Sequence, residues 1–234
     1  MNKNKTAVLI AAGSGMGADA AENLSSKNYN IAILSSSGKG EKLAKKLNGI
    51  GITGTNQSDK DIKNLINNTL DRWGRIDVLI NSAGHGPKGP ILDLSDDDWK
   101  IGMETYFLNV VRATRLVAPI MQKQKSGSII NISTFSAFEP DNAFPTSSVF
   151  RAGLASFTKL FVNQYSKDNI RMNNILPGFI DSLPEKKEYK DRIPLNRYGT
   201  VKEISELISF LVSDNGTYIT GQNIRIDGGI TKSV

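Results

Sequence analysis

The sequence contains no cysteine and a single histidine, His85, among its 234 residues. The absence of cysteine excludes disulfide bonds, thiol nucleophiles and cysteine-ligated metals, and one histidine cannot build a histidine-rich metal centre. We therefore expect no metal site. Long hydrophobic runs are also absent, since no segment approaches the 18 or so apolar residues that a membrane-spanning helix needs.

The first residues, MNKNKTAVLIAAGSG, place lysines ahead of an apolar run, as a secretory signal does. The run from Ala7 to Ala12 is too short for such a signal and glycines follow it at once, so we interpret it as a buried strand. With no signal and no spanning segment, we expect a cytoplasmic protein.

The net charge is +6, from 29 basic and 23 acidic residues. This charge would suit nucleic acid, an acidic carrier protein or a phosphate-rich cofactor as a partner, but scattered charges that only keep the protein soluble are the alternative. No block of Lys and Arg is interleaved with aromatic residues. We expect neither a nucleic-acid partner nor a membrane partner.

Short apolar, β-branched runs alternate with helix-length segments whose apolar residues recur with a period near 3.6. Such alternation predicts right-handed βαβ units. The predicted fold class is α/β: residues 1–234 form one Rossmann-like, doubly wound parallel sheet of about seven strands with helices on both faces. The predicted strands are 6–12, 29–36, 49–53, 77–84, 127–133, 170–178 and 222–229, and the predicted helices are 16–27, 60–72, 96–123, 147–167 and 201–212.

A glycine turn follows the first predicted strand. In AAGSGMGADAAENL, the residues Gly13, Gly15 and Ala18 satisfy the pattern G-x-G-x-x-A and lead into a helix. Glycines permit a tight turn and close backbone approach, so that a pyrophosphate can lie on the amides of the helix N-terminus. The pattern predicts a dinucleotide site, and a purely structural turn is the alternative.

The end of the second predicted strand bears on which dinucleotide is bound. An NAD site usually has an acidic residue there for the ribose hydroxyls, but this sequence reads LSSSGKGEK. Ser35, Ser36 and Ser37 could donate to a 2′-phosphate, and Lys39 or Lys42 could pair with its charge. We therefore expect NADP rather than NAD, with a polar loop carrying flexible lysines as the alternative.

From about Thr6 to Gly229 the chain resembles a short-chain dehydrogenase/reductase, close to the 3-oxoacyl carrier-protein reductase type. The segments that carry the resemblance, besides the glycine turn, are NSAG (81–84), DDDWK, GSIINIS (127–133), RMNNILPGFIDS (171–182), IPLNRYGTVKEIS (193–205) and YITGQNIRIDGG (218–229). The resemblance implies a nicotinamide-dependent oxidoreductase acting on a carbonyl or hydroxyl substrate, possibly bound to a carrier protein, and a homodimer or homotetramer.

The same resemblance implies a set of site residues. The family uses a Ser and a Tyr-x-x-x-Lys pair supported by an Asn, and these four positions fall here on Thr134, Ser147, Arg151 and Tyr106, so all four are changed. The glycine turn is also shorter than the family's. The implied cofactor-binding residues are Gly13, Ser14, Gly15, Met16, Gly17, Ser35, Ser36, Asn56, Asn81, Ala83, Gly84, Arg151, Pro177, Gly178, Ile180 and Ser182.

Each changed position has a functional and a structural interpretation. Ser147 is too short to replace a phenol, and we expect it to be the N-cap of a helix beginning near residue 148. Arg151 keeps a positive charge at the cofactor ribose, and Thr134 keeps a hydroxyl for a substrate oxygen. Tyr106 is either a relocated proton donor assisted by Arg151 or a core residue. His85 could approach the nicotinamide pocket, although a solvated loop histidine is the alternative.

The segment GFIDSLPEKKEYKDRI occupies the position of the family's substrate-covering loop. Its charge predicts a mobile, solvated segment whose inward-facing residues are Phe179, Ile180 and Leu183. Helices 96–123 and 147–167 carry apolar residues on more than one face, so one stripe should cover the sheet and another should form a subunit contact.

Two functions are compatible with this sequence. The first is an NADP-dependent oxidoreductase with an altered proton-handling group. The second is a non-catalytic relative that binds a dinucleotide or a metabolite and acts as a sensor or partner subunit, because the binding segments survive while the proton donor does not.

Overall fold

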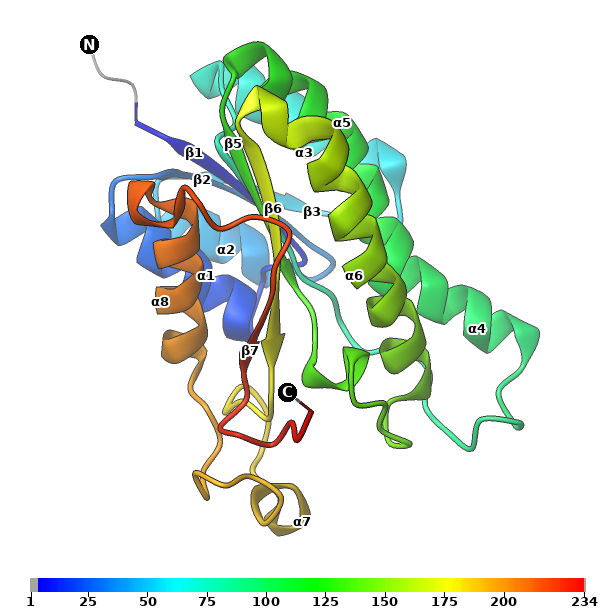
Figure 1. Cartoon of the computed structure of the whole chain (residues 1–234). Coiled ribbons are helices and arrows are strands. Elements are labelled where there is room, and N and C mark those ends of the chain that lie inside the picture. Colours follow the sequence, from blue (N-terminus) through cyan, green and yellow to red (C-terminus); the bar gives the residue numbers. More distant parts are fainter. Residues whose placement is uncertain (1–3, 234) are drawn as a thin grey trace.

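The apolar runs of the sequence form the strands of one parallel sheet in a computed structural model that describes residues 4–233. Within those residues the sheet has seven strands in the order β3-β2-β1-β4-β5-β6-β7 (Figure 1). The predicted α/β class with a parallel sheet is therefore confirmed. The strands are β1 (Thr6–Ile10), β2 (Asn30–Ser35), β3 (Ile50–Thr53), β4 (Val78–Asn81), β5 (Gly127–Ile132), β6 (Ile170–Pro177) and β7 (Asn223–Ile226).

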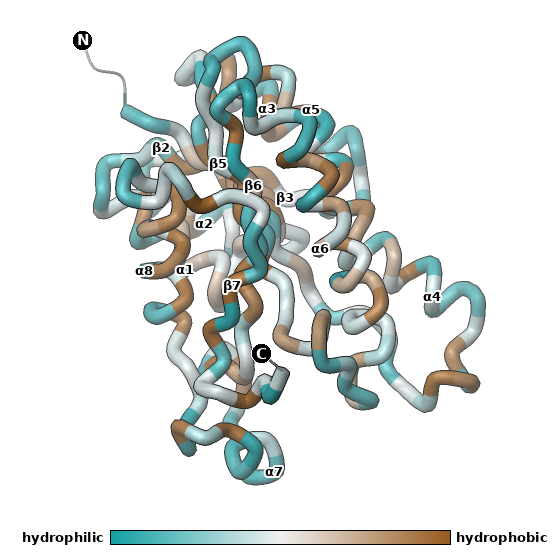
Figure 2. The backbone as a smooth tube through the Cα atoms, viewed as in Figure 1, coloured by the Kyte–Doolittle hydropathy of each residue, from teal (hydrophilic) through white to brown (hydrophobic). Residues whose placement is uncertain are grey.

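Helices cover both faces of the sheet, because alternate strand residues point to opposite sides and both sides are apolar. On one face α1 and α8 pack against residues such as Leu9 and Ile80, and on the other α3, α5 and α6 pack against residues such as Ile10 and Leu79. Figure 2 shows the hydrophobic residues concentrated on the strands and on the inner sides of the helices. The helices are α1 (Gly15–Ser26), α2 (Lys39–Lys46), α3 (Asp59–Trp73), α4 (Asp96–Met103), α5 (Asn109–Gln124), α6 (Pro145–Tyr165), α7 (Lys187–Lys190) and α8 (Val201–Val212).

Some elements differ from the sequence prediction. No helix was predicted over Lys39–Lys46 or Lys187–Lys190, which form α2 and α7, and Ala44 of α2 is buried in the core. The predicted helix 96–123 consists of α4 and α5 joined through a π-helical turn, η1 (Glu104–Leu108). Along residues 4–233, no helix combines the length and the apolar character needed to cross a membrane.

A row of asparagine side chains crosses the sheet on the face covered by α6. The amide Nδ2 of Asn81 donates to Oδ1 of Asn131 (2.9 Å), Asn131 donates to Asn174 (2.8 Å), and Asn174 donates to Asn223 (2.7 Å). These residues are direct register partners on β4, β5, β6 and β7, which places their side chains side by side. The hydroxyl of Thr158, on α6, also donates to Oδ1 of Asn174 (3.0 Å).

Breaking the asparagine row should destabilise the fold. We expect Asn131→Ala to lower the free energy of unfolding by about 2 to 4 kcal/mol, because two buried amide groups lose a partner and each unpaired group costs about 1 to 3 kcal/mol. Urea unfolding followed by tryptophan fluorescence measures this change. Asn142→Ala, at an exposed position, is the matched control and should change stability by less than about 0.5 kcal/mol. A loss of similar size in both variants would contradict a structural role for the row.

Candidate functional site

The predicted site residues gather at the carboxyl ends of the parallel strands, where ligands bind in open α/β sheets. The glycine turn follows β1, a loop of residues 82–95 follows β4, and a short 3-10 helix, η2 (Phe135–Ala137), follows β5. The segment 178–200 follows β6 and contains α7, which lies below this edge of the sheet in Figure 1.

Helix α6 carries two of the four residues that the resemblance assigns to the family's catalytic positions, Ser147 and Arg151. Ser147 and Arg151 lie one turn apart on its buried stripe, which continues through Leu154 and Thr158. The helix begins at Pro145 with Phe144 in the N-cap position and no side-chain cap, so the prediction that Ser147 caps a helix starting near residue 148 is wrong. Proline is favoured in the first helical turn, and Pro145 was the sequence signal for the true start.

The Arg151 guanidinium is a buried cation at this site, with 8% of the residue exposed. Its Nη1 donates to the main-chain oxygen of Ile132, the last residue of β5. Its Cζ lies 4.8 Å from the centroid of the Tyr106 ring, over the ring face. Burial lowers the pKa of Arg151 to about 10, so the side chain remains charged at neutral pH. Within the described part of the chain, Nε of Arg151 has no hydrogen-bond partner.

Tyr106 lies in the π-helical turn η1 and is buried, with 5% exposed. Its hydroxyl accepts a hydrogen bond from the main-chain amide of Gly86 (2.5 Å). A Cβ atom added at Gly86 would lie 2.7 Å from Cε2 of Tyr106, so the loop can approach the ring only because residue 86 is glycine. The hydroxyl of Tyr106 therefore links the loop after β4 to the π-helical turn η1, and its ring contacts the guanidinium of Arg151 on α6.

Thr134 and Ser147 contribute hydroxyl groups. Oγ1 of Thr134 accepts from the amide of Ser136 (3.3 Å) and lies 3.2 Å from Oγ of Ser136, which makes Thr134 the N-cap of η2. Ser147 is buried, with 9% exposed. Both hydroxyls thus lie in the region where β5 ends and α6 begins.

The glycine turn presents the first amides of α1 without a protein cap. Ser14 occupies the N-cap position but makes no side-chain capping bond, and the first turn, Gly15 to Gly17, contains no acidic residue. Helix N-terminal amides have no intrahelical carbonyl to bind, and their partial positive charge favours an anion. Gly15 adopts φ 57°, and a Cβ there would lie 3.2 Å from Cβ of Ser182, so glycine keeps the turn narrow beside the segment after β6. This donor set fits the pyrophosphate of a dinucleotide.

The serines at the end of β2 that were predicted to bind a 2′-phosphate differ in their exposure to solvent. Ser35 is buried, and its hydroxyl donates to the main-chain oxygen of Ser37 (2.9 Å) while its side chain occupies the space beside Gly13. Ser36, Ser37 and Lys39 are exposed and face solvent at this edge. Asn56 lies in the turn after β3 and is half-buried.

The loop after β4 carries the next predicted group. Asn81 is committed to the asparagine row, and its Oδ1 is buried without a partner in the residues described. Gly84 is exposed, and a Cβ added there would meet nothing within 4 Å, which leaves open space above the backbone next to Ala83. Partial desolvation and the positive charges of Lys88 and Arg151 lower the pKa of His85, so its imidazole is neutral at pH 7.

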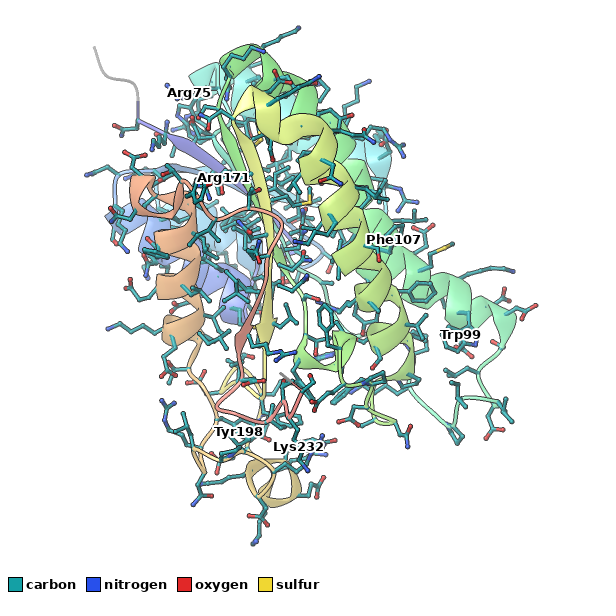
Figure 3. All side chains as sticks on the ribbon, in the orientation of Figure 1. Arg75, Trp99, Phe107, Arg171, Tyr198 and Lys232 are labelled. Carbon is teal, nitrogen blue, oxygen red and sulfur yellow. The ribbon has the colours of Figure 1, made fainter. Side chains whose placement is uncertain are left out.

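The segment after β6 is held by aromatic stacking that the sequence did not predict. Phe179 stacks on Tyr189 (centroids 4.4 Å apart, rings 7° from parallel) and also contacts Phe135, Phe144 and Tyr198. We call these five residues the aromatic cluster. Figure 3 places Tyr198 below the carboxyl ends of the strands, near the chain end at Lys232. Its members are far apart in sequence, so no local pattern could have identified it.

Other predictions for this segment have mixed outcomes. Phe179 and Ile180 point inward, as predicted, but Leu183 is 53% exposed, so its predicted inward position is wrong. Pro177 ends β6, and Gly178 packs against Asp227. The residues 181–188 are exposed, in agreement with the predicted solvated character of that stretch.

Comparison with known proteins identifies the relatives of this chain. The family model described as Enoyl-(Acyl carrier protein) reductase matches residues 10–231. The chain is 36% identical over 183 residues to a 3-oxoacyl-[acyl-carrier-protein] reductase FabG of Thermotoga maritima, covering 75% of this chain and 74% of the relative. It is 33% identical over 238 residues to the FabG of Buchnera aphidicola, covering 97% of each.

A solved structure agrees with this relationship. The acetoin dehydrogenase from Enterobacter cloacae superimposes with a TM-score of 0.90 at 26% identity, covering 98% of this chain and 96% of that chain. Nearly the whole chain thus shares its fold with that dehydrogenase. The chain belongs to the short-chain dehydrogenase/reductase family of NAD(P)-dependent oxidoreductases.

Proposed function

We propose that residues 1–234 form one domain that binds NADP and interconverts a carbonyl and a hydroxyl group through an altered proton-handling site. The observation that carries the proposal is the uncapped N-terminus of α1 after β1, on the same edge of the sheet as the polar residues Thr134, Ser147 and Arg151 after β5. Both lie at the carboxyl edge of the sheet, and both keep polar groups where a merely structural domain could be apolar.

The cofactor would be held mainly by backbone. The amides of Gly15, Met16 and Gly17 would bind the pyrophosphate, and the exposed Ser36 would lie near the adenosine ribose. Arg151 would bind the nicotinamide ribose with its free donors, and open space at Gly84 would admit the ring. When bound, NADPH supplies the hydride for carbonyl reduction.

The protein's own groups would act on the substrate oxygen. Thr134 would donate a hydrogen bond to it, and the permanent charge of Arg151 would stabilise negative charge developing there. Ser147 is too short for a phenol's reach and has no histidine to activate it. Tyr106 remains the candidate proton donor, because its oxygen accepts from Gly86 while its own proton is uncommitted.

The second candidate is a non-catalytic binding protein. It is favoured by the buried position of Tyr106, whose ring packs between Gly86 and Arg151 as a core residue would. On that interpretation the chain binds a dinucleotide or a metabolite and changes its interactions with a partner. The names of the relatives specify acyl carrier protein as the carrier of their substrate, so a carrier-bound carbonyl compound is one substrate class for the present chain and a free carbonyl compound is the other.

We further propose a cytoplasmic homodimer or homotetramer. Val110 and Phe161 are buried against the sheet, whereas Leu160 of α6 is 61% exposed and Val149 is also exposed. Trp99 and Phe107 project from the α4–η1 helix (Figure 3), where each ring packs against a phenylalanine of α6. The outward apolar face of α6 would then be buried between subunits.

The cofactor proposal predicts tighter binding of NADPH than of NADH. Calorimetric titration of each nucleotide should give a dissociation constant roughly tenfold lower for NADPH, because a 2′-phosphate gains charge-assisted hydrogen bonds at the end of β2. Lys39→Ala should weaken NADPH binding by roughly fivefold and leave NADH unchanged. Lys45→Ala, on the same helix, is the matched control. Binding of neither nucleotide would rule out the proposed function.

The proton-donor proposal predicts a loss of turnover in Tyr106→Phe. NADPH oxidation across a panel of carbonyl compounds should fall by about 100-fold, which is typical for loss of a general acid, while the NADPH dissociation constant stays unchanged. Phenylalanine keeps an aromatic ring at this position, so the cation–π contact with the Arg151 guanidinium is retained. Tyr165→Phe, in a stacked pair with Phe161, is the control. Equal rates in wild type and Tyr106→Phe would leave Tyr106 a packing residue.

The assembly proposal predicts that a charge on the outer face of α6 separates the subunits. Leu160→Lys should lower the mass measured by sedimentation at micromolar concentration to that of smaller species, because burying an unpaired ammonium costs several kcal/mol. Leu183→Lys, exposed in the segment after β6, should leave the mass unchanged. A wild-type monomer, or a Leu160→Lys variant of unchanged mass, would contradict the proposed interface.

A further inference from the structure

Arg151 is a cation whose charge the protein does not balance. Within residues 4–233 no carboxylate forms an ion pair with it, and the groups that touch its guanidinium are the Ile132 carbonyl and the Tyr106 ring. A buried charge without an opposite charge costs several kcal/mol, so proteins pair such groups or use them to bind an ion. Nε of Arg151 also lacks a hydrogen-bond partner.

The acidic residues near this edge of the sheet are already engaged. Asp141 pairs with Arg192 (2.7 Å), and Glu139 accepts from the main-chain amides of Lys232 and Ser233. Lys88, in the loop after β4, is a further cation at this edge, and its Nζ lies 4.8 Å from the centre of the Phe144 ring. The positive charges of Lys88 and Arg151 both act on His85, which places the three side chains around one region.

Two members of the aromatic cluster lie next in sequence to the polar residues of the candidate site. Phe135 follows Thr134 directly and contacts Phe179, and Phe144 precedes the helix that carries Arg151. The ion pair between Arg192 and Asp141 links the segment after β6 to the residues ahead of α6, and Arg192 also covers the face of Phe179. These contacts connect the segment after β6 to η2 and to the start of α6 through aromatic rings.

We propose that the substrate site takes a small carboxylate, such as a short oxo acid or hydroxy acid, whose anionic group pairs with Arg151 beside Thr134. This inference rests on the proposed function, since it names the substrate class of the same site. It favours a free acid over a carrier-bound thioester, because a thioester has no charge to offer Arg151 at the acyl end. The planar guanidinium can hold a carboxylate through two parallel hydrogen bonds.

The guanidinium has enough donors for this role. It carries five N–H groups, and one of its nitrogens, Nη1, is committed to the carbonyl of Ile132. Nη2 has no partner among the described residues and can therefore serve a carboxylate or a ribose hydroxyl, whereas Nε is buried without a partner. Lys88 at this edge of the sheet would attract the anion before it reaches the buried charge.

The test compares an anion with its uncharged analogue on the full-length protein. Acetoacetate and methyl acetoacetate share the reactive carbonyl and differ in charge, so calorimetric titration of each, with NADPH absent and present, isolates the carboxylate. We expect acetoacetate to bind on the order of 10- to 100-fold more tightly than the ester, as charge-assisted hydrogen bonds at a buried site provide. Sodium chloride at equal ionic strength should not compete.

Substitutions at Arg151 test whether the preference for the acid over the ester depends on its guanidinium. Arg151→Met removes the charge at similar length and should abolish the preference for the acid, whereas Arg151→Lys should retain part of it. Arg115→Met, at an exposed position on α5, is the matched control and should behave as wild type. If Arg151→Met fails to fold, the comparison of acid and ester on the wild-type protein still decides the proposal.

Several outcomes would overturn it. Equal binding of acid and ester, unchanged acid binding in Arg151→Met, or displacement of acetoacetate by chloride would each exclude a carboxylate site at Arg151. Displacement by NADPH would show that the anion occupies the cofactor's place and not the substrate's. Because NADPH binding is measured separately, tight NADPH binding without a preference for the acid overturns this inference and leaves the proposed function standing.

Discussion

The rotational setting of α6 is the constraint on which the site depends. Its buried stripe carries Ser147, Arg151 and Thr158, so one rotation of the helix places all three toward the sheet. The bond from Thr158 to Asn174 anchors the middle of the helix on the asparagine row, and the bond from Arg151 to Ile132 anchors its first turns on the end of β5. Two such hydrogen bonds restrict rotation of the helix about its axis. The positions of Ser147, Arg151 and Thr158 relative to the strand ends are therefore fixed.

The burial of Arg151 lowers the stability of the folded protein, and a bound anion would offset that cost. A guanidinium this deep with no carboxylate destabilises the folded state, and the aromatic face of Tyr106 offsets only part of that cost. Such uncompensated groups are common where a protein has to receive a ligand, since binding supplies what folding left unpaired. The buried Oδ1 of Asn81, also unpaired in the residues described, lies on the neighbouring strand end.

The sequence was sufficient for the fold and for the end of the sheet at which the candidate site residues lie. Each strand was visible as an apolar run, the glycine turn marked the start of α1, and spacing placed Thr134 and Arg151 at one end of the sheet. Helix α2 was missed because its glycines and lysines resemble a loop, and the true start of α6 at Pro145 was obscured by the serines that follow. The aromatic cluster and the stacking of Arg151 on Tyr106 join residues distant in the chain, and periodicity carries no information about such contacts.

The asparagine row has a direction. Asn81, Asn131 and Asn174 each donate toward β7 to the oxygen of the next amide, so turning one amide over would set two oxygens, or two NH₂ groups, against each other. The side chains of Asn81, Asn131, Asn174 and Asn223 must therefore keep a single common orientation or reverse together. This shared orientation couples the side chains of β4, β5, β6 and β7, so a change at one amide affects its neighbours along the row.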